Sequence, residues 1–92
     1  MQTFDKEYVC GIAKQILNID SPTGYTKRAI DFMDEEAKKL GYTTGRNQKG
    51  NLLIYVDGKD SEHTLGLSAH LDTLGLMVRS IKDNGKLAIT KV

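Results

Sequence analysis

The hydrophobic periodicity of this chain changes once, at Gly41, and that change restricts the folds open to it. Before Gly41, apolar residues recur at the spacing that places side chains on one face of an α-helix. After Gly41, short β-prone runs alternate with turn sequences, which is typical of strands. The pattern therefore predicts an α/β fold in which two N-terminal helices are followed by the strands of a mixed sheet.

The first part predicts helices over about Thr3–Asn18 and Tyr25–Leu40. Thr3 is placed to cap the first helix, whereas Gly41 and the lysines before it form a stop for the second. The acidic run at residues 34–36 is interpreted as solvated helix surface. The loop between the helices, NIDSPTGYT, contains the only proline and suits a tight turn.

The second part predicts strands separated by turn signals. Residues 42–56 predict a β-hairpin, and residues 74–92 predict another around the Asp83–Gly85 turn. The small and apolar residues 64–69 predict a buried central strand. The polar residues 59–63 predict a surface loop.

Length and composition exclude several classes of protein. A chain of 92 residues with a net charge of +1 has room for one small core and lacks the basic excess of a nucleic-acid-binding domain. No apolar run approaches the ~18 residues that a membrane span requires. The single cysteine, Cys10, excludes an internal disulfide and a multi-cysteine zinc site. Since the N-terminus also lacks the order of a signal peptide, we expect a cytoplasmic protein without nucleic-acid or membrane partners.

The most informative segment is Ser68–Asp72, at the C-terminal end of the expected central strand. His70 and Asp72 are two residues apart, so their side chains project to the same side of an extended chain. In α/β sheets, ligand sites form at such strand ends. A histidine there can offer one ring nitrogen to a metal, while a carboxylate fixes the tautomer through the other nitrogen or acts as a further ligand. The spacing alone also fits an ordinary structural pair.

A complete metal site is not found in the sequence. Zinc takes three or four ligands from histidine, cysteine, aspartate or glutamate. His63 lies in the expected surface loop, where we expect it to be solvated and without a role. If the chain belongs to a metal enzyme, most of the active site lies outside these residues.

The run Leu67–Val78 resembles the first metal-ligand segment of the tetrahedral (TET-type) dinuclear metallo-aminopeptidases. This family includes glutamyl and deblocking aminopeptidases, and its members are often labelled endoglucanase or cellulase. Ser21–Tyr25 resembles the loop before the second helix of the family, and Gly50–Leu53 resembles a family turn and strand. Thr26 departs from the glutamate that many members carry, although threonine also caps helices.

The resemblance implies that residues 1–73 are the first part of a metallopeptidase catalytic domain and that residues 74–92 begin a β-rich dimerisation insert. It implies that His70 is a ligand of one of two divalent metal ions, zinc or cobalt, and that Asp72 is the catalytic-site carboxylate that orients His70. A metal-activated water would then attack the N-terminal peptide bond of a peptide substrate. The parent protein would form a homo-oligomer. Because the remaining ligands and the general base are absent here, we expect the chain alone to be inactive.

Two other interpretations stay open at the level of sequence. The chain begins with Met1 and can pack one core, so it also fits a complete, small, non-catalytic α+β domain for protein interaction. A small mononuclear metal-binding module that depends on His70 is the other interpretation.

Overall fold

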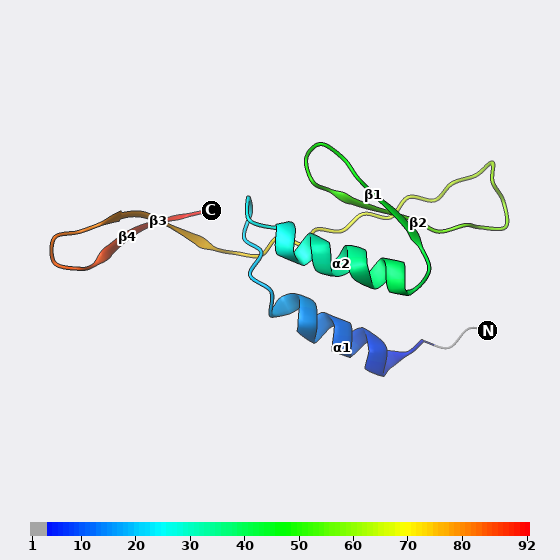
Figure 1. The fold of residues 1–92 in the computed structure, drawn as a ribbon, viewed down its shortest axis with the longest axis horizontal. Coiled ribbons are helices and arrows are strands. Elements are labelled where there is room, and N and C mark those ends of the chain that lie inside the picture. Colours follow the sequence, from blue (N-terminus) through cyan, green and yellow to red (C-terminus); the bar gives the residue numbers. More distant parts are fainter. Residues whose placement is uncertain (1–3) are drawn as a thin grey trace.

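The computed structural model describes residues 4–92 and shows two helices followed by two hairpins (Figure 1). The strands form two separate two-stranded sheets, both antiparallel. The predicted α/β class, with the helices first, is confirmed, but the strands of residues 4–92 form two antiparallel hairpins in place of the expected mixed sheet, because each strand pairs with its neighbour in sequence. Among the described residues, no helix is long and apolar enough to cross a membrane. The elements are α1 (Lys6–Leu17), α2 (Lys27–Lys39), β1 (Thr43–Arg46), β2 (Leu52–Tyr55), β3 (Leu76–Ile81) and β4 (Leu87–Lys91).

Both helices have defined ends. The predicted cap Thr3 lies outside the described residues, and Asp5 caps α1 by accepting a hydrogen bond of 3.0 Å from the backbone nitrogen of Tyr8. Helix α2 begins later than predicted, at Lys27, because Tyr25 lies in the preceding turn. It ends as predicted, since Gly41 adopts a φ of 89°, a left-handed conformation that glycine reaches without steric cost.

The interpretation of residues 34–36 as solvated surface is wrong for Asp34, which is buried. Its carboxylate accepts hydrogen bonds from Thr44 Oγ1 at 2.6 Å and from Arg46 Nη2 at 2.9 Å. Arg46 also reaches Asp31, with 2.7 Å between Nη2 and Oδ1. The pattern within α2 could not reveal this burial, because both donors come from β1. These contacts fasten α2 to the β1–β2 hairpin.

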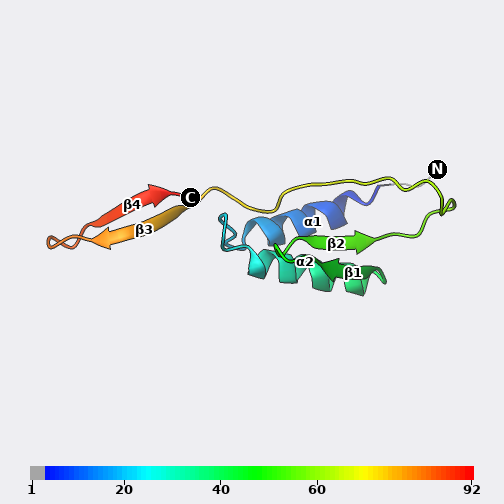
Figure 2. The ribbon, with the colours of Figure 1, turned by 90° about the horizontal axis from the view of Figure 1, so that it is seen from above.

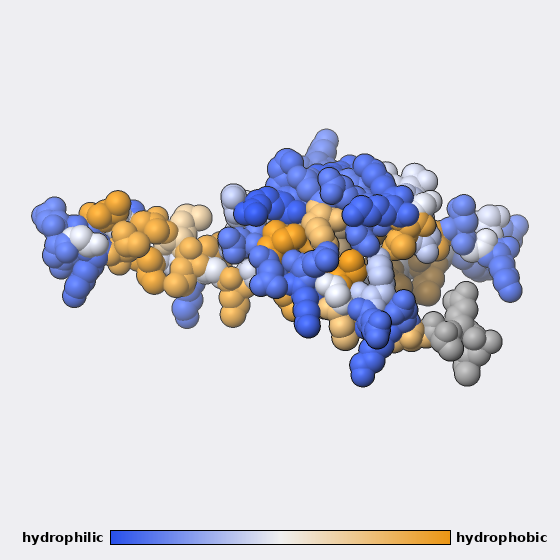
Figure 3. Space-filling model, turned by 60° about the horizontal axis from the view of Figure 1, so that its bottom comes forward, coloured by the Kyte–Doolittle hydropathy of each residue, from blue (hydrophilic) through white to orange (hydrophobic). Residues whose placement is uncertain are grey.

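The described residues bury few apolar side chains. Ala29 and Ala37 are the apolar residues that reach full or nearly full burial, and both lie on α2. The accessible surface is 8561 Å², whereas a compact protein of this mass exposes about 5300 Å². Figure 3 shows apolar side chains on the surface, many of them on the projecting β3–β4 hairpin. The single core expected from length is therefore small, and most of the apolar surface stays in contact with solvent.

The prediction of a buried central strand at residues 64–69 is wrong. The segment is not assigned to a strand, and the side chains of Leu65 and Leu67 are 82% and 90% exposed. A buried strand needs hydrogen-bonded neighbours, and the strands described here pair only within their own hairpins. In Figure 2 the segment crosses the helical body as an unpaired trace before it reaches β3.

The second predicted hairpin is confirmed as β3–β4. Its turn contains Gly85 with a φ of 83°, and a bulge lies between Val78 and Ser80. The hairpin projects away from the helices (Figure 1), and every residue of β3 is exposed. A two-stranded hairpin without further packing is marginally stable in water. The position of β3 and β4 is therefore set by the segment that connects them to the helical body.

The Asp34 contacts predict an acid-sensitive fold. The hydrogen bond from Thr44, and then that from Arg46, hold the pKa of Asp34 below its usual value. Because the unfolded-state pKa of aspartate is about 3.9, this stabilisation is complete above that value and is lost as pH falls through the lower folded-state pKa. We expect Asp34→Asn to unfold at lower urea concentration at pH 7 and to show a smaller loss of stability on acidification, measured by circular dichroism.

Glu35→Gln is the matched control, because Glu35 is an exposed neighbour on α2 and makes no ion pair within residues 4–92. It should keep the pH dependence of the wild type. An Asp34→Asn protein with an unchanged pH dependence would contradict the role given to the buried carboxylate.

Candidate functional site

The loop between the two helices is attached to the segment that follows residues 64–70. The backbone oxygen of Ser21 accepts a hydrogen bond of 2.8 Å from the Thr73 nitrogen, and Ser21 Oγ donates to the Leu71 oxygen at 3.1 Å. Pro22 and Thr73 form an isolated parallel bridge. Ser21 is 1% exposed, so its hydroxyl and its backbone oxygen are buried, and each makes a hydrogen bond. The loop and the segment thus form one local unit.

Gly75 permits this close approach. A Cβ atom built on Gly75 would lie 2.4 Å from the Cβ atom of Pro22, which is closer than carbon atoms approach without displacement. The backbone oxygen of Gly75 also accepts a hydrogen bond of 3.2 Å from the nitrogen of Val92, at the end of the second hairpin. Glycine at this position therefore allows the loop, the segment and the base of the hairpin to meet.

The predicted site residues His70 and Asp72 lie together beside this loop. Asp72 Oδ1 is 3.1 Å from His70 Nδ1, and Asp72 Oδ2 accepts a hydrogen bond of 2.7 Å from Thr23 Oγ1. The bond from Thr23 is the main cause that holds the pKa of Asp72 below its usual value, and the His70 contacts act in the same direction. Asp72 is therefore ionised at neutral pH and engaged through both oxygens.

These contacts define the tautomer of His70. Its Nδ1 atom lies 3.1 Å from both the backbone oxygen and the Oδ1 atom of Asp72. Both partners are acceptors, so Nδ1 carries the proton and the lone pair of the neutral ring is on Nε2. The imidazole is 86% exposed, and no hydrogen bond to Nε2 is found in the described part of the chain. Nε2 is the free ligand atom of the pair.

A cavity of about 660 Å³ adjoins the pair. Its wall includes Thr23, His70 and Asp72, together with apolar residues of α2 and β2 such as Met33 and Leu52. The polar groups thus lie at the edge of a mostly apolar hollow between the helix, the first hairpin and residues 67–72.

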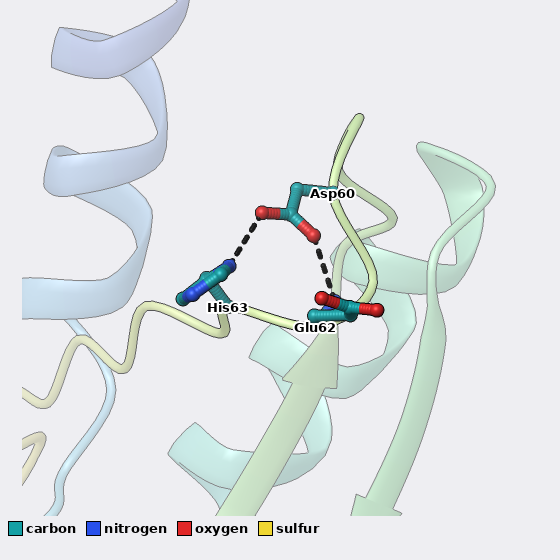
Figure 4. Close-up of side chains that lie close together, drawn as sticks. All are labelled: Asp60, Glu62 and His63. Carbon is teal, nitrogen blue, oxygen red and sulfur yellow. Dashed lines mark hydrogen bonds and ion pairs between the residues drawn. The ribbon is translucent and has the colours of Figure 1, made fainter.

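A second cluster lies in the surface loop before residue 64 (Figure 4). Asp60, Glu62 and His63 place their ligand atoms within 4.8 Å of one another. Asp60 accepts from the Glu62 backbone nitrogen at 2.8 Å and lies 2.7 Å from His63 Nδ1. As expected, His63 is exposed, at 83%. These contacts close a local turn of the kind that aspartate forms with the backbone two residues later, which accounts for the cluster without a metal.

Sequence reasoning found His70 and Asp72 but not the residues that hold them. Thr23 and Ser21 were interpreted as part of a turn that resembles a family loop, and no local pattern connects them with residues distant in sequence. The contact of His63 with Asp60 follows from their spacing of three residues, so it was in principle visible in the sequence.

The comparisons with known proteins cover the part of the chain that carries the pair. Residues 50–92, which include His70 and Asp72, match the sequence profile of the M42 glutamyl aminopeptidases. Over these residues the chain is similar to the M42 family. It is also similar to the putative aminopeptidase YhfE of Bacillus subtilis, with 40% identity over 78 residues that cover 85% of this chain and 22% of that protein. Peptidases of the M42 family depend on metal ions.

A further similarity is to glutaredoxin-3 of Mus musculus, with 33% identity over 82 residues that cover 89% of this chain and 21% of that protein. The single cysteine, Cys10, is exposed on α1, and the structure shows no hydrogen bond to its thiol within residues 4–92. The chain spans about a fifth of the length of each of these two curated relatives.

The contact between Gly75 and Pro22 predicts that Gly75→Ala separates the loop from the segment. Because the added methyl group must displace Pro22, we expect the free energy of unfolding to fall by about 1–3 kcal/mol, the usual cost of overpacking. The measurement is urea unfolding followed by circular dichroism. Gly66→Ala is the matched control, since a Cβ atom at Gly66 meets no atom within 4 Å. Equal stability of the two variants would show that the close approach is not needed.

Proposed function

We propose that this chain is the N-terminal segment of a metal-dependent aminopeptidase that removes N-terminal residues from peptides. Residues 1–73 would form the first part of its catalytic domain, and residues 74–92 would begin a β-rich dimerisation insert. The observation that carries the proposal is the His70–Asp72 pair, which lies within the M42 match and leaves a ring nitrogen free. The projecting, exposed β3–β4 hairpin supports the separate assignment of the last residues.

The described residues fit part of a metal site. Nε2 of His70 is exposed and free of intramolecular hydrogen bonds, and a carboxylate engages the opposite ring nitrogen. This arrangement of imidazole and carboxylate is the usual one for a histidine that binds zinc or a similar transition metal. His70 would hold one of two divalent ions, zinc or cobalt, and Asp72 would orient the ring. The remaining ligands would come from other parts of the protein.

A bound zinc or cobalt ion would supply Lewis-acid polarisation of the peptide carbonyl and activation of water for hydrolysis. The part of this chain in the reaction is to place the imidazole. Asp72 keeps the proton on Nδ1, so that Nε2 presents its lone pair, and the ionised carboxylate stabilises the positive charge that the ring acquires on binding a cation. The bond from Thr23 lowers the pKa of Asp72 and thereby keeps the carboxylate charged at neutral pH.

For the protein as a whole, we propose a cytoplasmic location, a peptide substrate and assembly into a homo-oligomer. These assignments are supported by the family resemblance. The alternative, a self-contained domain for protein interaction, is less well supported because the described residues bury only Ala29 and Ala37 as an apolar core. A mononuclear metal-binding module would use the same histidine. It differs from the proposed site in the number of the other ligands and in the part of the protein that supplies them.

The role of His70 predicts which histidine binds metal. We expect zinc added to the ¹⁵N-labelled chain to shift the Nε2 resonance of His70 in the wild type and in His63→Ala, and to leave the His63 resonances of His70→Ala unchanged. His63→Ala is the matched control, because His63 is equally exposed and lies in the only other candidate cluster of residues 4–92. Binding that is lost in His63→Ala and kept in His70→Ala would move the metal site to residues 60–63.

The number of ligands predicts that the chain alone has no peptidase activity. One imidazole and one carboxylate are fewer than the three protein ligands that a catalytic zinc ion usually has. We therefore expect the purified chain with added zinc or cobalt to release p-nitroaniline from aminoacyl-p-nitroanilides no faster than the metal alone. Turnover above the metal-only rate that disappears in His70→Ala would show that these residues form a complete site.

A further inference from the structure

Thr23 is the residue through which the loop between the helices reaches the candidate site. Its hydroxyl donates to Asp72 Oδ2 at 2.7 Å, the shortest of the side-chain contacts made by Asp72. The other carboxylate oxygen, Oδ1, is directed at His70 Nδ1. Two contacts at the two oxygens fix the rotation of the carboxylate, so the position of the ring depends on the group that holds Oδ2.

The position of Thr23 is itself fixed by its neighbours. Ser21 is attached through two hydrogen bonds to Leu71 and Thr73, the residues on either side of Asp72. Pro22 lies against Gly75. These contacts hold the backbone on both sides of the Thr23–Asp72 bond, so the hydroxyl meets Oδ2 without depending on a mobile loop.

We expect the chain to fold without this bond. Thr23 is exposed, so its hydroxyl would be hydrated if Asp72 were absent, and no buried polar group would be left unsatisfied. The two hydrogen bonds of the buried Ser21 already attach the loop. The Thr23 hydroxyl therefore orients the carboxylate of Asp72, and it is not needed to attach the loop.

We propose that Thr23 is a positioning residue that fixes the tautomer and orientation of the His70 ring through Asp72. For its catalytic consequence this inference rests on the proposed function, in which Nε2 of His70 faces a metal ion. The contacts follow one another. The Thr23 hydroxyl donates to the carboxylate of Asp72, and this carboxylate accepts from Nδ1 of His70. The lone pair of the ring is then on Nε2. Loss of the hydroxyl would let the carboxylate rotate away from Nδ1 and would leave the backbone oxygen of Asp72, 3.1 Å from Nδ1, as the remaining acceptor for that proton.

The test is the tautomer of His70 in the whole 92-residue chain, measured by long-range ¹H–¹⁵N correlation without metal. The spectrum is recorded at a pH at which the correlation pattern itself is that of a neutral imidazole. We expect the wild type to carry its proton mainly on Nδ1 of His70. In Thr23→Val the ratio of the Nδ1-protonated to the Nε2-protonated form should fall by about fivefold, the size expected for one lost hydrogen bond.

Three comparisons make the test specific. Thr23→Ser, which keeps the hydroxyl, should restore most of the wild-type ratio. Thr26→Val is the matched control and should leave the ratio unchanged, because Thr26 lies at the start of α2 and makes no side-chain cap hydrogen bond. The resonances of His63, whose Nδ1 atom faces Asp60 elsewhere in the chain, should not move in any of these variants.

Several results would overturn the proposal. An unchanged His70 tautomer in Thr23→Val, while Asp72→Ala alters it, would show that Asp72 orients the ring without Thr23. Loss of the helical circular dichroism signal in Thr23→Val would assign the hydroxyl to folding instead of positioning. The readout needs neither metal nor peptidase activity, so a failure of the aminopeptidase proposal would not be mistaken for a failure of this one.

Discussion

The two hydrogen bonds of Ser21 connect the helical part of the chain to the segment that carries the candidate site. Ser21 is the most deeply buried polar residue described. Its hydroxyl and its backbone oxygen both make hydrogen bonds to the residues that flank Asp72. Breaking either bond would leave a buried polar group without a partner, which costs more than the bond contributes when formed. The positions of Thr23, Asp72 and His70 all depend on this attachment.

Local patterns predicted the local features of the fold. Helical spacing identified α1 and α2, Gly41 marked the end of α2, and turn sequences identified both hairpins. The same reasoning gave the pairing of His70 with Asp72, because residues two apart in an extended segment share a side. Features that depend on distant partners were not accessible in this way. The burial of Asp34 depends on donors from β1, and the support of Asp72 depends on a loop 49 residues away in the sequence.

The error at residues 64–69 has the same origin. Small and apolar residues favour a buried strand, but burial requires hydrogen-bonding neighbours and a covering layer. Within the described residues, β1 and β2 pair with each other and leave Leu65 and Leu67 in solvent. The chain accordingly has a radius of gyration of 17.9 Å, compared with about 12 Å for a compact domain of this length. Composition shows that a segment is able to be buried, whereas the surrounding chain determines whether it is.

The sequence separation within the site also affects the order in which its parts form. His70 and Asp72 are two residues apart, whereas Ser21 and Leu71 are separated by 50. At about 5–20 residues per second of synthesis, the loop around Ser21 is made roughly 2.5–10 s before its partners. During that interval the polar groups of Ser21 are left to water, and the imidazole–carboxylate pair has not yet been made. The contacts that support the site can therefore form only after the helices have been synthesised. They form when the turn around Ser21 contacts the segment around Leu71, which is synthesised later.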